Sequence, residues 1–241
     1  MLKVLDSAVP VACWSCSVAH NDSTLFCPHC SKIQPPPGGD YFSVFGMEPR
    51  LNLDLAELEH EFHRLSRKVH PDRFARAGDN ERQWSLADTA LLNDAYRTLK
   101  DPIARTEYLL KLEGVELEEQ SKSATEAARA SGTAKKQIVP EDLLEEAFEL
   151  NMQLEEMRMA KKMGGDDPQL RSDLLAAKAG FDAKMSATQA ELESLWARWD
   201  AALDTEDAPA KLAARDAMVA LLNRRSYLRN LVRDVNDAME A

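Results

Sequence analysis

Four cysteines near the start of the chain form two closely spaced pairs, Cys13-Trp-Ser-Cys16 and Cys27-Pro-His-Cys30. Two residues between the members of a pair let both thiolates turn toward one centre. Two such pairs supply the four soft ligands that tetrahedral Zn²⁺ prefers. We therefore predict one structural zinc ion bound by all four cysteines. No position on the metal is then left open for catalysis.

Other uses of these cysteines stay open at this point. A rubredoxin-like iron site takes the same four ligands, and His29 beside Cys30 is compatible with a dithiol redox pair. No cysteine follows Cys30, which indicates a local site rather than a disulfide-stabilised secreted protein. Four unliganded thiols are not expected in so small a segment. We expect this module to stabilise or recruit, and to do no chemistry itself.

A second stretch that could do chemistry is KVHPDRFA, residues 68–75. His70 and Asp72 could form an acid/base pair, a metal site or a surface that binds another protein. Catalysis would need a nucleophile or a substrate pocket, yet the sequence holds no G-x-S-x-G motif, Gly-rich phosphate loop or H-E-x-x-H motif. A metal site would need His60 and His63 as ligands, and these are more simply read as solvent-facing positions. We expect no enzyme activity from this chain.

Basic residues concentrate around His-Pro-Asp. Arg64, Arg67 and Lys68 have helical spacing on a face away from the apolar residues, and Arg73 and Arg76 follow. Residues 64–76 thus hold five basic residues against one acidic residue, inside a chain of net charge -11. A run of charge is often only a solvated face. Beside the rigid Pro71 turn, this one favours a docking surface for an acidic partner.

Two amphipathic helices must position this loop. In the first, residues at spacings of three and four form one apolar stripe, with Asp54 before it as a candidate N-cap. That stripe consists of Leu55, Leu58, Phe62, Leu65 and Val69. The second helix carries Leu92, Ala95, Tyr96 and Leu99 and should end near Asp101-Pro102. We expect the two helices to pack antiparallel over these stripes.

The composition predicts an all-α protein, with 44% hydrophobic residues, 29% charged residues and few glycines and prolines. The acidic balance argues against nucleic acid as a partner, and no apolar run is long enough to cross a membrane. A cytoplasmic location is expected, or the mitochondrial matrix in a eukaryote, although no transit peptide is seen. We divide the chain into a metal-binding module with a Pro/Gly linker (1–39), a helical hairpin unit (40–112), a mobile connection (113–139) and a C-terminal bundle (140–241).

Three helices are predicted in the C-terminal region, at roughly 141–162, 168–203 and 208–239. Each carries an apolar stripe, which is sufficient for a small antiparallel bundle. The first helix also has Leu144, Phe148 and Met152 on an adjoining face, four residues apart. These side chains either widen the buried face or form an exposed patch that recognises another protein.

The hairpin unit resembles the J-domain of DnaJ-type co-chaperones. The resemblance rests on the HPD loop, LNDAY (92–96), Asp101-Pro102, Arg105 and Tyr108, together with the opening DYFSVFG (40–46). In that family the HPD turn and the basic face of the preceding helix dock on a DnaK-type chaperone and trigger its ATP hydrolysis. The resemblance therefore implies a chaperone-binding surface made of His70, Pro71, Asp72, Arg64, Arg67, Lys68 and Arg73.

The J-domain followed by an acidic helical region resembles the HscB family, the co-chaperones of iron–sulfur cluster assembly. DYFSVFGMEPRLNLD, KVHPDRFA and EYLLKLEGVEL carry this resemblance, which covers residues 40–241 with a looser stretch at 116–139. It implies that Leu144, Phe148 and Tyr227 bind an IscU-type scaffold protein. Glu145 departs from the family, which usually has an apolar residue there. The tetracysteine prefix is a second departure, since many bacterial members begin directly at the J-domain.

The resemblance thus implies a two-ended adaptor that delivers an IscU-type scaffold to an HscA/DnaK-type chaperone and stimulates its ATPase. Two rival functions are kept. One is a J-domain co-chaperone for other clients, and the other is a thiol redox or metal-transfer protein acting through the tetracysteine module. Self-association through that module is left open.

Overall fold

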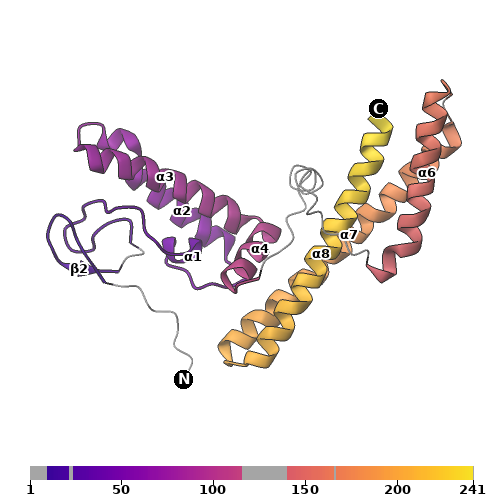
Figure 1. Ribbon diagram of the computed structural model, residues 1–241. Helices are drawn as coiled ribbons and strands as arrows, with labels where there is room; N and C mark the ends of the chain where they lie inside the picture. Colours follow the sequence, from indigo (N-terminus) through magenta and orange to yellow (C-terminus); the bar gives the residue numbers. More distant parts are fainter. Residues whose placement is uncertain (1–9, 22–23, 116–139, 166, 241) are drawn as a thin grey trace. The chain divides into compact units, whose positions relative to one another are not determined.

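The computed structural model describes residues 10–21, 24–115, 140–165 and 167–240. The chain forms two compact units. Unit 1 is residues 1–114 with 199–208, and unit 2 is residues 115–198 with 209–241. The architecture is helical apart from one small hairpin, as predicted (Figure 1). The proposed mobile connection lies mostly outside the described residues, and the four-part division of the chain stays a prediction.

Two antiparallel helices dominate unit 1, α2 (Leu55–Val69) and α3 (Asp79–Lys100), as Figure 1 shows. Asp54 caps α2 as predicted, because its carboxylate accepts hydrogen bonds from the amides of Ala56 and Glu57. The buried contact joins the two apolar stripes, except for Leu55 and the half-buried pair Phe62 and Tyr96. Leu55 is exposed in the first turn, and Phe62 is half-buried in a stack on Tyr96, with ring centroids 4.1 Å apart. The buried members are Leu58, Leu65 and Val69 from α2, and Leu92, Ala95 and Leu99 from α3.

One shorter helix precedes this hairpin in the chain and another follows it. Helix α1 (Tyr41–Val44) is capped by Asp40, and α4 (Pro102–Leu112) is capped by Asp101 with proline in its first turn. The Tyr108 hydroxyl accepts a hydrogen bond from the Tyr41 amide at 2.9 Å, and the two rings stack 4.4 Å apart. The start and end of the hairpin unit are thereby tied together.

The cysteine module contains the antiparallel strands β1 (Val11–Ala12) and β2 (Ala19–His20). After the second cysteine pair, Ile33 pairs with Phe26 and is fully buried. The amide of Gln34 bonds to the carbonyl of Leu25 at 2.9 Å. The module therefore includes Gln34, the first residue of the predicted Pro/Gly linker QPPPGG (34–39).

Unit 1 also includes the turn between the last two helices of the chain, α7 (Pro168–Asp204) and α8 (Ala208–Glu240). Asp200 is buried, and its carboxylate accepts hydrogen bonds from the amides of Leu51 and Asn52 at 3.0 and 2.9 Å. Arg50 pairs with Asp204 at 2.5 Å. A buried charge is tolerated when several donors satisfy it, so Asp200 is a fixed anchor for the loop before α2.

Unit 2 is built from α6 (Leu144–Lys162) and the remaining parts of α7 and α8. These bounds match the three predicted helices to within a few residues. A short 3₁₀ turn, η2 (Glu141–Leu143), precedes α6. Ion pairs join Glu146 to Lys184 and Asp142 to Arg224 at the edges of the core. The core consists of Leu143, Ala147, Leu150, Leu154, Met157, Leu170, Leu174, Phe181, Tyr227, Leu228, Leu231 and Val235. None of the described helices is both long and apolar enough to cross a membrane.

One buried group in unit 1 conflicts with the apolar packing around it. The carboxyl of Asp88 on α3 is fully buried, and neither of its oxygens has a hydrogen-bond partner among the described residues. Burial disfavours the charged form and raises its pKa from 3.8 to about 7. The folded chain therefore keeps this proton up to near neutral pH, whereas the unfolded chain releases it near pH 4.

We expect the free energy of unfolding to fall as pH rises from about 4 to about 7, because the unfolded state loses its proton first. The Asp88 contribution is at most about 4 kcal/mol over this window. Asp88→Asn should remove that decline, as measured by urea unfolding at several pH values. Asp94→Asn is the control, since Asp94 is exposed on the same helix and pairs with Arg97. Equal pH dependence in Asp88→Asn and the native chain would contradict the assignment.

Candidate functional site

The His-Pro-Asp loop is a single turn of 3₁₀ helix, η1 (Pro71–Phe74), between α2 and α3. His70 ends α2 and caps η1, because its Nδ1 accepts a hydrogen bond from the Asp72 amide at 3.3 Å. Pro71 occupies the first position of the turn, where its fixed φ and missing N–H cost nothing. The imidazole and the Asp72 carboxylate are both exposed. The turn therefore presents two polar groups to solvent on a rigid support.

Helix α2 presents basic residues beside this loop. Arg67, Lys68, Arg73 and Arg76 are all exposed, and Arg73 donates to the carbonyl of Arg67 at 3.4 Å. Arg64 differs, because Glu61 binds its guanidinium at 2.5 Å. These hydrogen bonds lower the pKa of the Glu61 carboxyl. The net positive charge of this surface is thus smaller than the charges of residues 64–76 alone indicate, because Glu61, which lies just before these residues, pairs with Arg64.

An open groove runs between α2 and the loop, with a volume of about 650 Å³. It is lined by His60, His63, Ser66, Arg67, His70 and Arg73. Among the described residues, Ser66 makes no hydrogen bond to a histidine, so no activated nucleophile is present there. His60 and His63 are not joined by a third metal-ligating residue in the described part of the chain, where the cysteines form the one such cluster. The groove has the chemistry of a binding surface.

The two cysteine pairs adopt the same backbone turn. The amide of the first cysteine bonds to the carbonyl five residues later, from Cys13 to Val18 at 3.0 Å and from Cys27 to Lys32 at 2.9 Å. The serine after each pair has a positive φ, 61° at Ser17 and 58° at Ser31. This conformation usually favours glycine, so two serines at these positions do not predict it. Two equivalent turns thus aim two thiols each at one point.

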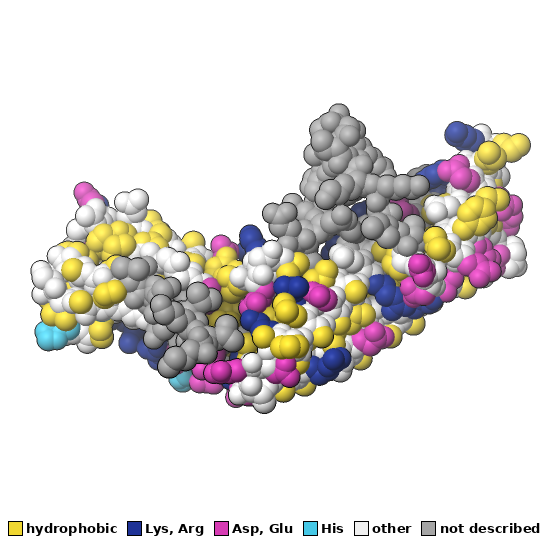
Figure 2. Space-filling view, turned by 60° about the horizontal axis from the view of Figure 1, so that its bottom comes forward, with side chains coloured by type: hydrophobic (Ala, Val, Ile, Leu, Met, Phe, Trp, Pro, Cys, Tyr) yellow, Lys and Arg dark blue, Asp and Glu magenta, His cyan; other side chains and the backbone are white. Residues whose placement is uncertain are grey.

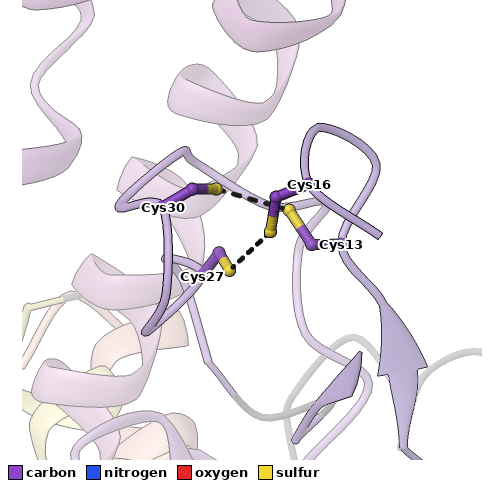
Figure 3. A group of neighbouring side chains, drawn as sticks. All are labelled: Cys13, Cys16, Cys27 and Cys30. Atoms are coloured by element: carbon purple, nitrogen blue, oxygen red, sulfur yellow. Dashed lines mark hydrogen bonds between the residues drawn. The ribbon is translucent and has the colours of Figure 1, made fainter. Parts of the chain in front are cut away.

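The four sulfur atoms converge as a metal site requires (Figure 3). All lie within 4.8 Å of one another, with Sγ–Sγ distances of 3.6 Å for Cys13–Cys30 and 3.7 Å for Cys16–Cys27. A tetrahedron with Zn–S bonds of about 2.3 Å has S–S edges of about 3.8 Å. A disulfide would need about 2.0 Å. The spacing therefore fits a tetrahedral metal ion, which would hold the two turns together.

Burial and hydrogen bonds shift the pKa values of Cys13 and Cys16 in opposite directions. Burial opposes the Cys13 thiolate, but the amides of Cys16 and Ser15 and the thiol of Cys30 outweigh burial and lower the pKa of Cys13 to about 6. The Val18 amide lowers the pKa of Cys16, but burial and the neighbouring thiols raise it to about 12. A bound cation would relieve this crowding of sulfur by stabilising all four thiolates.

A buried polar network supports the first ligand, and the sequence analysis missed it. Nε2 of His20 lies 3.1 Å from Oε1 of Gln34, and Nε2 of Gln34 donates to Sγ of Cys13 at 3.5 Å. The same amide nitrogen donates to the carbonyl of Lys32 at 2.8 Å. Donors of this kind orient metal ligands and tune their basicity. Gln34 lies at the start of a proline-rich segment, and this composition predicts a linker and not a residue that bonds to a metal ligand.

Helix α6 has an exposed apolar face opposite its buried one. Leu144, Phe148 and Met152 are 53%, 70% and 61% exposed, which decides in favour of a surface patch over a wide buried face. Met159 and Met163 continue the same stripe, within an arc of about 100° at 3.6 residues per turn. We call these five residues the α6 stripe. Figure 2 shows apolar side chains among acidic ones at its right-hand end, where α6 lies in Figure 1.

Tyr227 lies on α8 and is only 8% exposed, because it packs in the core of unit 2. Burial raises the pKa of its hydroxyl. Its predicted place in the scaffold-binding patch stays a prediction, as do those of Leu144 and Phe148. In the free chain Tyr227 supports α6 from within and offers little area of its own.

The chain is similar to known proteins in both sequence and fold. No model of a known protein family matches the chain. Two proteins named iron-sulfur cluster co-chaperone protein HscB are similar in sequence, from mouse at 40% identity over 111 residues and from human at 39% over 113 residues. These alignments cover 44% and 45% of this chain. They cover 47% and 48% of the two proteins, so the chain spans about half the length of the curated relatives it matches.

The similarity in fold covers more of the chain than the similarity in sequence. The crystal structure of human co-chaperone protein HscB matches with a TM-score of 0.60 and 25% identity, over 94% of this chain and 97% of the other. The chaperone HscB from Vibrio cholerae matches with a TM-score of 0.52 and 25% identity, over 84% and 98%. The predicted resemblance to HscB co-chaperones and the predicted all-α architecture are confirmed. The clustered cysteines fit the predicted tetracysteine module.

We expect the purified chain to hold one zinc ion, lost in Cys27→Ser. Gln34→Leu should weaken zinc binding about tenfold or more, because the Cys13 thiolate loses a hydrogen-bond donor. Competition with a chromogenic chelator measures this. Gln189→Leu is the control, an exposed glutamine on α7. Iron, reversible thiol oxidation without a metal, or unchanged affinity in Gln34→Leu would each contradict one part of the prediction.

Proposed function

We propose that this chain is a co-chaperone of the HscB type, which brings an IscU-type scaffold protein to an HscA/DnaK-type chaperone and stimulates the ATPase of that chaperone. One observation carries the proposal. The His-Pro-Asp turn is held exposed between two packed helices, beside a basic face, in a chain whose fold matches human HscB over 94% of its length. The chain supplies binding surfaces, and ATP hydrolysis takes place on the partner.

The chaperone would dock on the loop and on the basic face of α2. Arg67 and Lys68 project from this face and Arg73 from the loop, and the acidic remainder of the chain makes this basic surface a distinct local feature. Charge of this kind steers an acidic partner into register and raises its association rate. The polar tip made by His70 and Asp72 then gives specificity, because hydrogen bonds to an exposed rigid turn require matched geometry.

The scaffold would bind the α6 stripe. A contiguous exposed apolar surface is costly in water unless a partner covers it, and aromatic anchors such as Phe148 dominate the energetics of such surfaces. Glu145 and Glu149 flank the stripe and are exposed. They complement a scaffold surface with a basic rim. Glu145 stands where the HscB family usually has an apolar residue, so part of the contact is electrostatic here.

The tetracysteine module would hold one structural zinc ion through its four thiolates. A zinc ion with four protein ligands has no open position and stabilises its segment by binding energy. The module then contributes to the stability of unit 1 and takes no part in cluster chemistry.

The first test is steady-state ATP hydrolysis by the host's DnaK-type chaperones, with and without this chain and the scaffold. We expect synergistic stimulation by chain plus scaffold, reduced at least about tenfold in His70→Gln because the docking turn loses a central polar group. His29→Gln is the control, an exposed histidine in the cysteine module. Stimulation without any scaffold effect would move the client to another class of protein. No stimulation of any host chaperone would refute the J-domain role.

A second test addresses the α6 stripe. We expect Leu144→Ala and Phe148→Ala to weaken scaffold binding about tenfold or more, since truncation of an interface anchor costs ~2 kcal/mol. Stability of the free chain should change little, because both side chains are exposed. Leu212→Ala is the matched control, a leucine of similar exposure on α8. Titration calorimetry with purified scaffold measures the affinity. Equal losses in Leu144→Ala and Leu212→Ala would exclude the stripe as the binding surface.

A further inference from the structure

The cysteine module packs against the first turns of α3, which directly follow the His-Pro-Asp loop. Trp14, inside the first cysteine pair, meets Trp84 of α3 with ring centroids 5.7 Å apart. Lys32, just after the second pair, lies 5.9 Å from the centre of the Trp14 ring and bonds to Glu81 of α3 at 3.2 Å. One contact therefore comes from each cysteine pair, and both reach the same end of α3.

Glu81 has a second role at this position. Its Oε1 binds the Lys32 ammonium, while its Oε2 accepts a hydrogen bond from the Gly78 amide at 3.2 Å and so caps α3. Its side chain is only 14% exposed, which strengthens both interactions relative to those of a solvated carboxylate. Gly78 ends the segment that begins at His70. The module thus reaches the carboxyl end of the loop through Glu81.

The other end of the loop is held by the same turns of α3. The hydroxyl of Ser85, next to Trp84, donates a hydrogen bond to the carbonyl of Val69, the residue before His70. Ser85 is fully buried. Glu81 and Ser85 of α3 therefore hold the two ends of the docking turn, Glu81 through the amide of Gly78 and Ser85 through the carbonyl of Val69.

The cysteine turns determine where Lys32 and Trp14 lie. The Lys32 carbonyl accepts the Cys27 amide at 2.9 Å and so closes the second turn. The indole Nε1 of Trp14 donates to the Ile33 carbonyl at 2.7 Å, which joins the first cysteine pair to the segment after the second pair. A metal bound by the four sulfur atoms would fix both turns and thereby both contacts with α3.

We propose that the metal-loaded module holds the His-Pro-Asp loop in its docking conformation, with Lys32 and Trp14 as positioning residues that act through Glu81 and Trp84. This inference rests on the proposed J-domain function. When the metal leaves, the two turns loosen and the Lys32–Glu81 and Trp14–Trp84 contacts weaken. The first turns of α3 then open more often, and the loop samples conformations that do not dock. Metal loading of the module thereby sets the activity of a loop that carries no metal ligand.

Hydrogen exchange of the full-length chain tests this without any chaperone. With zinc removed by a chelator, amide exchange in residues 68–85 should be at least about tenfold faster, while residues 92–110 keep their protection. In the zinc-loaded chain, Lys32→Met should speed exchange in residues 68–85 up to about fivefold, the range of one partly exposed ion pair. Glu81→Gln should act like Lys32→Met, because glutamine keeps the cap on Gly78 but lacks the charge that binds lysine.

Lys100→Met is the matched control, since the Lys100 ammonium also lies over an aromatic ring, that of Tyr96, and donates a hydrogen bond to the Tyr96 hydroxyl, but at the far end of α3. It should leave exchange in residues 68–85 unchanged. Unaltered exchange in residues 68–85 after zinc removal, or equal effects of Lys32→Met and Lys100→Met, would overturn the proposal. So would a uniform rise in exchange throughout unit 1. If the J-domain function alone were wrong, no variant would alter a chaperone ATPase while the exchange pattern would persist.

Discussion

Packing between α2 and α3 is the interaction on which the functional surfaces of unit 1 depend. Three buried side chains of α2 meet three of α3, and this contact fixes the distance that the loop between them must span. The connection spans that distance with one 3₁₀ turn and the residues that lead to α3, and the side chains of His70 and Asp72 are exposed on it. The same contact leaves the opposite face of α2 to solvent, where Arg67 and Lys68 are exposed.

The two proposed binding surfaces use different physical chemistry. The face of α2 is charged, so its association with a partner should weaken with added salt over a Debye length of about 10 Å at 0.1 M. The α6 stripe is apolar with acidic neighbours, so its affinity should depend mainly on buried area and less on salt. Each surface belongs to its own compact unit. An adaptor with such surfaces can bind two partners whose interactions respond separately to ionic conditions.

Sequence reasoning predicted what local chemistry and periodicity encode. The helices of both units, the cap at Asp54 and the convergence of the cysteines follow from spacing, because one residue type at a fixed interval defines one face or one turn. Whether Phe148 is exposed could be decided only from the structure. An apolar residue next to a stripe has the same spacing in the sequence whether it is buried or exposed. Periodicity alone could not distinguish these cases.

Contacts between distant segments stayed hidden for a different reason. Gln34 reaches Cys13 across the module, and Lys32 reaches Glu81 across 49 residues. Each depends on how segments pack, and neither produces a pattern along the chain. Ser17 and Ser31 show the converse, since they occupy a conformation in which glycine would have been the expected signal.

Asp200 has a consequence for synthesis of the protein. Its carboxylate completes the loop before α2, yet it lies in a stretch that begins 85 positions after residue 114, where the rest of unit 1 ends. At about 5–20 residues per second, a ribosome needs roughly ten seconds to add those positions. During that time the amides of Leu51 and Asn52 lack the carboxylate that accepts from them in the folded chain. Unit 1 therefore reaches its final hydrogen-bonded state only after residues 115–198 of unit 2 have been made, while residues 209–241 of unit 2 still have to follow.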